Sequence, residues 1–569
     1  MSNIAGCPSN DKPWLKFYDK NQLDEELPVQ SIYEYMYENN KDHLEDIALI
    51  YLKKKITYGQ LIDNISIVEK ALIALGVKKG DIVTVAMPCT PEAVYCVYAL
   101  NKIRAVANMI HPLAGSNEIV DYLNEVQSTV FLMFTGTYAI IKDVLDKTNV
   151  KTAVVAYPTE SLGRIVNTIF KVKSEKIKWS KQVISWSDFI KDGKSISELK
   201  IEDVNCHEIS IMSHTGGTTG TPKCVMLTDY NINSAIWQIG ATMKHDRQET
   251  MLVCLPPFVN YSLTNSILEP LAYGFKAVLV PEYHAEKFAE YVAEYKFNHL
   301  NAIPAYWEAL LNIKGIEKCD LSNLVYCFYG GDAMNPVSEA KVNDILISGG
   351  AKHKLGKGYG ATEMTSAVTA TFDECNEPGS IGIPLPKMIC QIVDSETNEE
   401  LGYGEEGEIC FTGPSIMVGY YQNEVATNEI IKVHSDGHRY IHMGDLGYIT
   451  KDGVIFITGR IKRLMITKGR DGMITKIFPE RIEKVIMQHP RVKLCCTIGI
   501  ADEYRVNIPK SFIVLNEVGG DIDKIKSEIT SLCNEELPEY MVPEEIEIID
   551  VVPRTPRGKV DYRALEMRR

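Results

Sequence analysis

Residues 213–223 read Ser213-His214-Thr215-Gly216-Gly217-Thr218-Thr219-Gly220-Thr221-Pro222-Lys223 and directly follow the apolar run 209–212. The glycines predict a loop directly after the apolar run. Three glycines let backbone amides turn inward, four threonines offer hydroxyl donors, and Lys223 adds a positive charge. These properties predict a loop that holds a polyphosphate, through Thr215, Gly216, Gly217, Thr218, Thr219, Gly220 and Lys223.

This loop differs from the phosphate loop of kinases and GTPases. Lys223 follows a proline, and Cys224 stands where that motif needs serine or threonine. A glycine-rich loop alone is weak support for a function, and a flexible surface loop is the alternative. Motifs elsewhere in the chain are needed to choose between a polyphosphate-binding loop and a flexible surface loop.

Length and composition limit the possible classes of protein. A chain of 569 residues is too long for one hydrophobic core, so we expect at least two domains. The net charge of −15 disfavours a nucleic-acid partner. The 14 cysteines form no CxxC pair, which favours buried reduced thiols over a structural zinc site. No apolar run approaches the roughly 18 residues of a membrane-spanning helix, so we expect a cytoplasmic protein without an integral membrane segment.

The first half of the chain alternates strand and helix patterns. Residues 81–88, 129–134 and 152–157 predict buried strands, and residues 91–110 predict a helix with proline near its start. This rhythm indicates an α/β domain with a largely parallel sheet. Residues 158–205 are a polar interruption, for which we predict a solvated surface helix, with a helix on a membrane surface as the alternative.

The pattern changes near the C-terminus. A strand at 454–457 is followed by a predicted β-hairpin with its turn at Asp471-Gly472, and then by a helix that opens at Pro479. Short strands and helices continue to the end. These signals predict a separate α+β domain of about a hundred residues.

Further segments occur in a fixed order along nearly the whole chain. They are Gly330-Gly331-Asp332-Ala333, Gly358-Tyr359-Gly360-Ala361-Thr362-Glu363, residues 407–421, Gly444-Asp445-Leu446-Gly447-Tyr448, Gly459-Arg460-Ile461-Lys462 and Pro553-Arg554-Thr555-Pro556-Arg557-Gly558-Lys559. Together with the loop at 213–223, the set resembles the adenylate-forming superfamily of acyl-CoA synthetases, luciferases and peptide-synthetase adenylation domains. Each motif is common alone, but the set in this order is specific.

The resemblance implies a role for each segment. Gly331, Asp332 and Ala333 match the loop beside adenine, and the segment containing Tyr359 and Gly360 supplies an aromatic face to it. Thr362 and Glu363 are implied as catalytic, with Glu363 holding magnesium. Asp445 is implied to bind both ribose hydroxyls, Arg460 to contact the nucleotide, and Lys559 to be the catalytic lysine of the terminal loop. The implied substrates and cofactors are ATP, Mg²⁺ and coenzyme A.

The implied fold is α/β with two unequal domains. The large N-terminal domain, residues 1–461, has β-sheets layered with helices and a small β-barrel-like part. The small mobile α+β lid, residues 462–569, is joined to it by a hinge at Lys462. A two-step reaction in one cleft gives a physical reason for such a moving lid.

Two departures from the family concern the substrates. Val259, Asn260 and Tyr261 match the substrate pocket, where Val259 replaces a frequent histidine and no aspartate is present for an amino group. An amino-acid substrate is therefore disfavoured. Nine residues separate Gly469 from Pro479, which lengthens the hairpin on the predicted CoA side. A simple longer turn accounts for this, and an unusual thiol acceptor is the alternative.

The expected activity is that of an acid–thiol ligase, an AMP-forming acyl-CoA synthetase. It joins a small carboxylic acid, a medium- or long-chain fatty acid or an aromatic acid, to CoA through acyl-AMP and releases pyrophosphate. One alternative is an acyl-AMP ligase that loads a separate carrier protein. A non-enzymatic nucleotide-binding module is a minor alternative.

Overall fold

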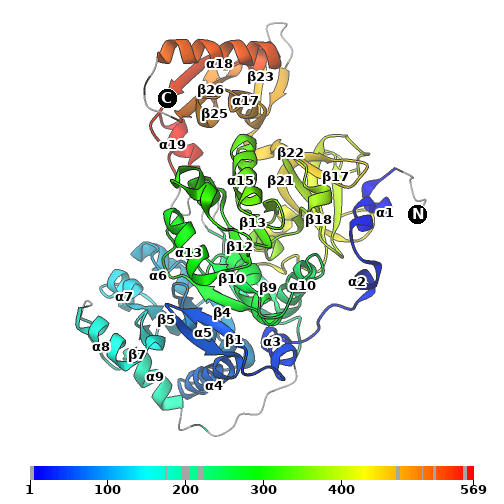
Figure 1. Ribbon diagram of the computed structural model, residues 1–569. Coiled ribbons are helices and arrows are strands. Elements are labelled where there is room, and N and C mark those ends of the chain that lie inside the picture. Colours follow the sequence, from blue (N-terminus) through cyan, green and yellow to red (C-terminus); the bar gives the residue numbers. More distant parts are fainter. Residues whose placement is uncertain are drawn as a thin grey trace.

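A computed structural model describes residues 6–173, 176–193, 196, 204–215, 222–468, 474–502, 504–516, 519, 521–554 and 560–568. The chain forms a large part, made of three sheets and their helices, and a smaller part near the C-terminus (Figure 1).

The first sheet has eight strands. In order across the sheet they are β19 (Gly419–Tyr420), β9 (Cys224–Thr228), β8 (Ile209–His214), β4 (Val106–Met109), β3 (Ile82–Ala86), β5 (Val130–Phe134), β6 (Thr152–Ala156) and β7 (Val183–Ser185). The six strands from β8 to β7 are parallel, while β9 pairs antiparallel with both β8 and β19. The three strands predicted in the first half of the chain are confirmed as β3, β5 and β6.

The helix predicted at 91–110 is wrong in its second half. Helix α5 (Pro91–Lys102) ends before Arg104, whose φ of 61° is incompatible with a continuing right-handed helix. Residues 106–109 form the buried strand β4 instead. Tertiary pairing with β3 and β8 therefore decided the conformation of an apolar run that periodicity alone leaves ambiguous.

The second sheet has seven strands and lies beside the first. Its order is β14 (Gly356–Lys357), β13 (Tyr326–Tyr329), β12 (His299–Ala302), β10 (Thr250–Val253), β11 (Lys276–Leu279), β1 (Ile47–Tyr51) and β2 (Lys54–Thr57). All neighbours are parallel except the β1–β2 pair. Helices α5 and α10 (Asp229–Gly240) are almost completely buried and belong to the core shared by the two sheets.

Further helices surround the sheets (Figure 1). The longer ones are α3 (Ile32–Asn40), α4 (Tyr58–Ala74), α6 (Ser116–Glu125), α7 (Thr135–Ile141), α8 (Arg164–Lys173), α9 (Trp186–Gly193), α13 (Phe288–Tyr295) and α15 (Pro336–Ser348). The short ones are α1 (Pro8–Asp11), α2 (Lys20–Asp24), α11 (Asn260–Ser262), α12 (Glu269–Ala272), α14 (Pro304–Glu308) and α16 (Glu424–Ile430). Of these, α11 and α12 are largely buried. Helix α8 lies in the predicted polar interruption and exposes Ile165, Ile169 and Val172, and its solvated state stays a prediction. Within the described residues, we find no helix with the length and apolarity that crossing a membrane requires.

The third sheet is antiparallel and corresponds to the predicted β-barrel-like part. Its path is β15 (Thr369–Ala370), β16 (Ser380–Pro384), β22 (Ile455–Arg460), β21 (Arg439–Ile449), β18 (Gly407–Thr412) and β17 (Ile389–Val393). Strand β20 (Ile431–Val433) pairs with β21 off this path.

The C-terminal part has its own hydrophobic cores. Hairpin β23 (Met465–Lys468) and β24 (Ile474–Ile477) precedes a three-stranded sheet of β25 (Val492–Asp502), β26 (Val506–Leu515) and β27 (Glu545–Ile548). Its helices are α17 (Pro479–Ile486), α18 (Ile522–Glu536) and α19 (Tyr562–Glu566). The pairing of Lys468 with Ile474 confirms the predicted hairpin, whose turn at Asp471-Gly472 lies outside the described residues. The domain boundary at Lys462 stays a prediction.

One carboxyl group lies inside the core. Glu269 opens α12 and is 1% exposed, and burial raises its pKa to about 8. Its Oε1 lies 3.5 Å from Nε2 of His245, whose pKa is lowered to about 4 by burial and by the neighbouring His299. At neutral pH the two groups are therefore an uncharged acid and an uncharged imidazole.

Glu269 predicts a loss of stability with rising pH. Because the pKa of Glu269 is higher in the folded state, its contribution is complete below the ordinary value of 4.5 and is lost as the pH rises to about 8. Over that range this group lowers the free energy of unfolding by about 1.4 kcal/mol per pH unit. We expect Glu269→Gln to remove this group's share of the pH dependence in denaturant unfolding, while Glu92, whose pKa burial raises to about 7, keeps its own share. The exposed Glu282 gives the control Glu282→Gln, and an equal change in both variants would contradict the assignment.

Candidate active site

The predicted site residues collect where parallel strands end. Strand β8 leads into the loop at 213–223, β10 into the segment with Val259, β13 into Gly331 and β14 into Tyr359. Ligands of open α/β sheets bind at the carboxyl ends of the strands, because the loops there converge on one crevice. The topology therefore brings together segments that are far apart in the sequence.

The polyphosphate loop joins two antiparallel strands. His214 is paired with Cys224 across β8 and β9. The amide of Thr215 donates to the carbonyl of Lys223 at 2.9 Å, and the amide of Lys223 donates to Oγ1 of Thr215 at 3.1 Å. These bonds close the base of the loop. Gly216, Gly217, Thr218, Thr219 and Gly220 lie outside the described residues.

Glu363 lies within reach of this loop through Tyr420. Glu363 belongs to the 3₁₀ turn Thr362–Met364 and is 7% exposed. The hydroxyl of Tyr420 donates to Oε1 of Glu363 at 2.8 Å, and Nζ of Lys223 lies 4.8 Å from the centre of the Tyr420 ring. Burial and the Glu363 carboxylate raise the pKa of Tyr420 well above its ordinary value, so this hydroxyl stays a donor.

No sequence motif predicted a role for Tyr420. It lies in the segment 407–421, whose resemblance to the family was noted, but its contact with Glu363 depends on the pairing of β19 with β9. The only local signal was a tyrosine in a segment that resembles the family. Its position opposite the predicted phosphate loop depends on strand pairing, which the sequence does not display.

Asp445 is the centre of a second group. It is 1% exposed and lies opposite Arg460 in the β21–β22 pair. Nε of Arg460 donates to Oδ1 of Asp445 at 2.5 Å, and the hydroxyl of Tyr359 donates to Oδ2, also at 2.5 Å. Burial and the nearby Asp445 charge raise the pKa of the Tyr359 phenol. The structure thus gathers three predicted nucleotide-binding residues, with the carboxylate already engaged by two donors.

The remaining nucleotide residues lie on two neighbouring turns. Gly331 has a φ of 85° and begins the exposed turn after β13, where the amide of Ala333 donates to Oδ1 of Asp332 at 2.9 Å. Gly360 pairs with Ala367, and a Cβ atom there would lie 1.7 Å from the carbonyl oxygen of Ser366. Close packing of the backbone therefore requires glycine at 360, whether or not a nucleotide is bound.

An apolar cavity lies beside the predicted substrate residues. Tyr261 and Gly358 belong to its wall, and the other apolar lining residues are Ile239, Met243, Met251, Phe275, Tyr326, Phe328, Ala367 and Ala370. Oδ1 of Asn260 accepts from the hydroxyl of Ser213 at 2.6 Å, which links this segment to the start of the polyphosphate loop. Among the described residues, Nδ2 of Asn260 and the hydroxyl of Tyr261 are buried without a hydrogen-bond partner. Val259 is partly buried.

The chain passes between the two parts at residues 460–463. Arg460 is held by Asp445 in the large part, while Arg463 donates to Glu480 at 2.7 Å and to Glu483 at 2.6 Å in α17 of the small part. Lys462 lies between these two anchors and is exposed. Such an arrangement leaves the backbone at Lys462 as the least restrained link.

The terminal loop begins beside the predicted adenine loop. Lys559 and Gly469 both lie outside the described residues. The base of the terminal loop is described, because Arg554 is paired with Val560. Burial raises the pKa of Glu308 in α14, and the charges of Arg554 and Asp332 act on it in opposite directions. Arg554 of the small part and Asp332 of the large part therefore lie near the same carboxyl group.

Comparisons with known proteins agree with this geometry. The family model described as "AMP-binding enzyme" matches residues 36–421, and "AMP-binding enzyme C-terminal domain" matches residues 481–559. A long-chain-fatty-acid–CoA ligase of Bacillus subtilis is 28% identical and covers 98% of both chains. A similar ligase of Escherichia coli O157:H7 is 26% identical, covering 97% of this chain and 98% of its own. A probable 4-coumarate–CoA ligase 3 of Dictyostelium discoideum is 28% identical over 80% of each chain.

Solved structures share the fold. The anthranilate CoA ligase AuaEII with anthranoyl-AMP has a TM-score of 0.80 at 20% identity, covering 95% of this chain and 98% of that one. MatB from Rhodopseudomonas palustris with bound ATP also has a TM-score of 0.80 at 20% identity, covering 94% and 98%. The first family model alone matches well over half of the residues in sequence order. This protein is a member of the AMP-binding enzyme family.

Proposed function

We propose that this protein is an acid–thiol ligase that uses ATP to convert a carboxylic acid into acyl-AMP and then transfers the acyl group to the thiol of coenzyme A. The observation that carries the proposal is the convergence of Lys223, Tyr420 and Glu363 on one side and Tyr359, Asp445 and Arg460 on the other. An apolar cavity adjoins them. Relatives matched over nearly their whole length are named CoA ligases, which supports the same reaction.

The first step joins two anions. A carboxylate oxygen attacks the α-phosphorus of ATP, the bond from that phosphorus to the bridging oxygen breaks, and pyrophosphate leaves. Thr215, the residues 216–220 and Lys223 are proposed to hold the phosphates through amides, hydroxyls and one ammonium group. Lys559 is proposed to enter from the terminal loop and offset charge at the reacting phosphate, with Thr362 nearby.

The nucleoside is proposed to lie between the turns with Gly331 and Tyr359. Asp445 would accept from the ribose hydroxyls, and Arg460 would keep that carboxylate oriented. The Tyr359 ring would face adenine. Asp332 and Ala333 would border the same base on the exposed turn after β13.

Glu363 fits a magnesium ligand. Its carboxylate is buried and oriented by Tyr420, and Mg²⁺ prefers oxygen ligands while keeping waters and phosphate oxygens in its shell. When bound, the ion would offset negative charge on the phosphates. Nζ of Lys223 lies 4.8 Å from the centre of the Tyr420 ring, so we propose that both positive charges act on the same phosphates.

The cavity favours an uncharged acid. Most of its lining residues are aromatic or aliphatic, and burial keeps two of its titratable members, Glu269 and His245, uncharged at neutral pH. A second ionised group on the acid would be desolvated there without an opposite charge. A medium- or long-chain fatty acid or an aromatic acid is therefore the proposed substrate class, bounded by Val259, Asn260 and Tyr261.

The test is a panel of fatty, aromatic and amino acids with ATP and magnesium, in the presence and absence of CoA. Pyrophosphate release and mass spectrometry of the acyl products are measured. We expect acyl-CoA from at least one fatty or aromatic acid and none from amino acids. If acyl-AMP accumulates and CoA never discharges it, the CoA-ligase proposal fails and a carrier protein becomes the acceptor to test.

Lys559 should be needed for the adenylation half-reaction only. Lys559→Ala should cost about 2–4 kcal/mol of transition-state stabilisation in adenylation, because a charge-offsetting group is lost. Thioester formation from supplied acyl-AMP should survive much better. Single-turnover kinetics of each half-reaction check this, and equal losses in both would show that Lys559 has a different role.

The proposed hinge at Lys462 should be needed for the second half-reaction, the transfer of the acyl group to CoA. Proline fixes φ, so Lys462→Pro should retain acyl-AMP formation and impair transfer to CoA, where the hairpin with Gly469 is proposed to approach the site. Lys462→Ala is the matched control, since it removes the side chain and keeps the backbone freedom. Normal thioester formation by the proline variant would place the hinge elsewhere.

A further inference from the structure

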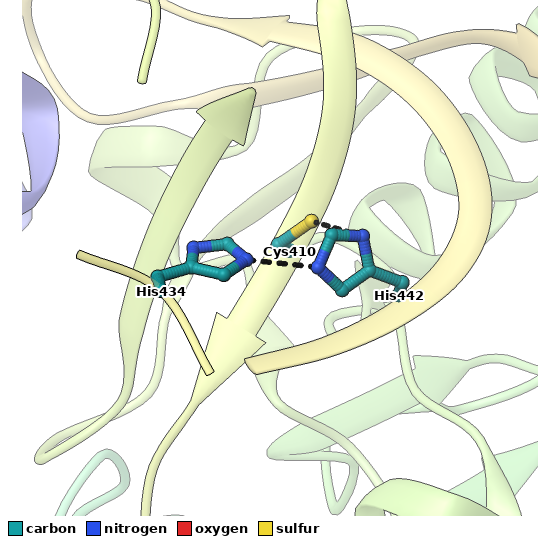
Figure 2. A group of neighbouring side chains, drawn as sticks. All are labelled: Cys410, His434 and His442. Atoms are coloured by element: carbon teal, nitrogen blue, oxygen red, sulfur yellow. Dashed lines mark hydrogen bonds between the residues drawn. The ribbon is translucent and has the colours of Figure 1, made fainter. Parts of the chain in front are cut away.

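A group of buried polar residues crosses the third sheet (Figure 2). Gln391 of β17 lies opposite Cys410 of β18, and Cys410 lies opposite His442 of β21. These three residues therefore form one row across neighbouring strands. His434, directly after β20, joins them from the turn that leads into β21. Cys410 is 0% exposed, His442 5% and His434 8%.

The two imidazoles face each other. Nε2 of His434 lies 2.8 Å from Nε2 of His442, and Sγ of Cys410 lies 3.3 Å from Nδ1 of His442. One ligand atom from each of the three residues can be chosen so that all lie within 4.8 Å of one another. Figure 2 shows the sulfur beside the edge of the His442 ring that His434 approaches.

The outer nitrogens of both rings face oxygen acceptors. Nδ1 of His442 lies 2.9 Å from Oε2 of Glu408, and Nδ1 of His434 lies 2.6 Å from Oε1 of Gln391. The orientation of the Gln391 amide follows from Ser9, whose hydroxyl donates to Glu400 at 2.6 Å and so can only accept from Nε2 of Gln391, at 3.4 Å. The carbonyl oxygen of Gln391 must then face His434. Each Nδ1 therefore carries a proton.

The inner nitrogens are consequently left with lone pairs. In neutral histidine one ring nitrogen is a donor and the other an acceptor, so two protonated Nδ1 atoms leave two bare Nε2 atoms. Two lone pairs 2.8 Å apart repel, so the contact needs either a shared proton, as in an N–H···N hydrogen bond, or a metal ion beside both nitrogens. The Cys410 sulfur lies beside the His442 ring and offers a third, soft ligand in the same cluster. A ligating histidine whose other nitrogen donates to a carboxylate or carbonyl is the usual outer arrangement of protein metal sites.

We propose that Cys410, His434 and His442 bind one Zn²⁺ ion through Sγ and the two Nε2 atoms, with Glu408 and Gln391 orienting the imidazoles. Sulfur and nitrogen ligands select zinc over magnesium or calcium. Zn–N bonds of about 2.0–2.1 Å at a tetrahedral angle hold two nitrogens about 3.3 Å apart, so the rings need to separate by about half an ångström. The Cys410 sulfur, which lies 3.3 Å from Nδ1 of His442, also has to turn toward the facing Nε2 atoms to complete the ligand set. Binding displaces the thiol proton to solvent, and the thiolate and the Glu408 carboxylate then balance the charge of the ion.

The zinc site is connected to the nucleotide residues. Oε1 of Glu408 accepts from the amide of Gly444 at 3.1 Å, while its other oxygen faces His442. Gly444 directly precedes Asp445 on β21. A metal ion that fixes His442 and Glu408 would therefore brace the strand segment that presents Asp445. Zinc binding itself does not depend on the proposed ligase activity.

The test measures metal on the full-length protein without substrates. After reconstitution with Zn²⁺ and removal of free metal, we expect about one zinc per chain by elemental mass spectrometry. Replacement by Co²⁺ should give visible d–d bands of a tetrahedral site together with a thiolate-to-cobalt charge-transfer band. A wild-type protein that retains less than about a tenth of an equivalent of either metal would overturn the proposal.

Variants assign the ligands. Cys410→Ser should abolish the charge-transfer band and lower zinc retention at least about tenfold, and His434→Gln should also lower retention about tenfold. Cys390→Ser is the matched control, since Cys390 is equally buried on the neighbouring strand β17 and is not part of the cluster. Equal cobalt spectra of Cys410→Ser and the wild type would refute the site. Should Cys410→Ser not fold, the charge-transfer band of the wild-type protein decides the question by itself.

Discussion

The buried charge of Asp445 constrains the architecture around it. A carboxylate with 1% exposure is stable only with a charged or hydrogen-bonding partner, and Arg460 supplies both from the adjacent strand. Because Arg460 is the last residue of β22, this pairing fixes where the third sheet ends and where the chain leaves the large part. Tyr359 reaches the same carboxylate from the second sheet. One ion pair thus sets the relative position of two sheets and the origin of the small part.

A second arginine, Arg463, anchors the other end of the link between the two parts. The Arg463 guanidinium is held by Glu480 and Glu483 and stacks on the Tyr562 ring at 4.1 Å, all within the small part. Because Arg460 and Arg463 are three residues apart and anchored in different parts, any rotation of the proposed lid would have to be absorbed by very few backbone angles. A short link of this kind keeps the two parts close.

Much of the fold could be predicted from local patterns, because buried strands and loop glycines leave strong local signals. The strands at 82–86 and 130–134 and the hairpin before Pro479 are examples. The helix predicted at 91–110 failed because the short run 106–109 fits a strand or a helix equally well until neighbouring strands are known. Tyr420 and the group of Cys410, His434 and His442 depend on strand pairing. Their spacing in the sequence resembles no motif, since one cysteine and two histidines come from three different segments.

Burial of the cysteines limits their reaction with the acyl adenylate. An acyl adenylate is an electrophile that an external thiol consumes, and this chain has thiols of its own near the site, among them Cys224 and Cys254. Cys224 adjoins Lys223, and Cys254 follows β10 close enough to affect Tyr261. Burial raises the pKa of both thiols well above the ordinary value, so both remain protonated, and a thiol is a far weaker nucleophile than a thiolate. The enzyme is thereby protected from acylating itself, and the activated acyl group waits for a thiol that arrives from solution.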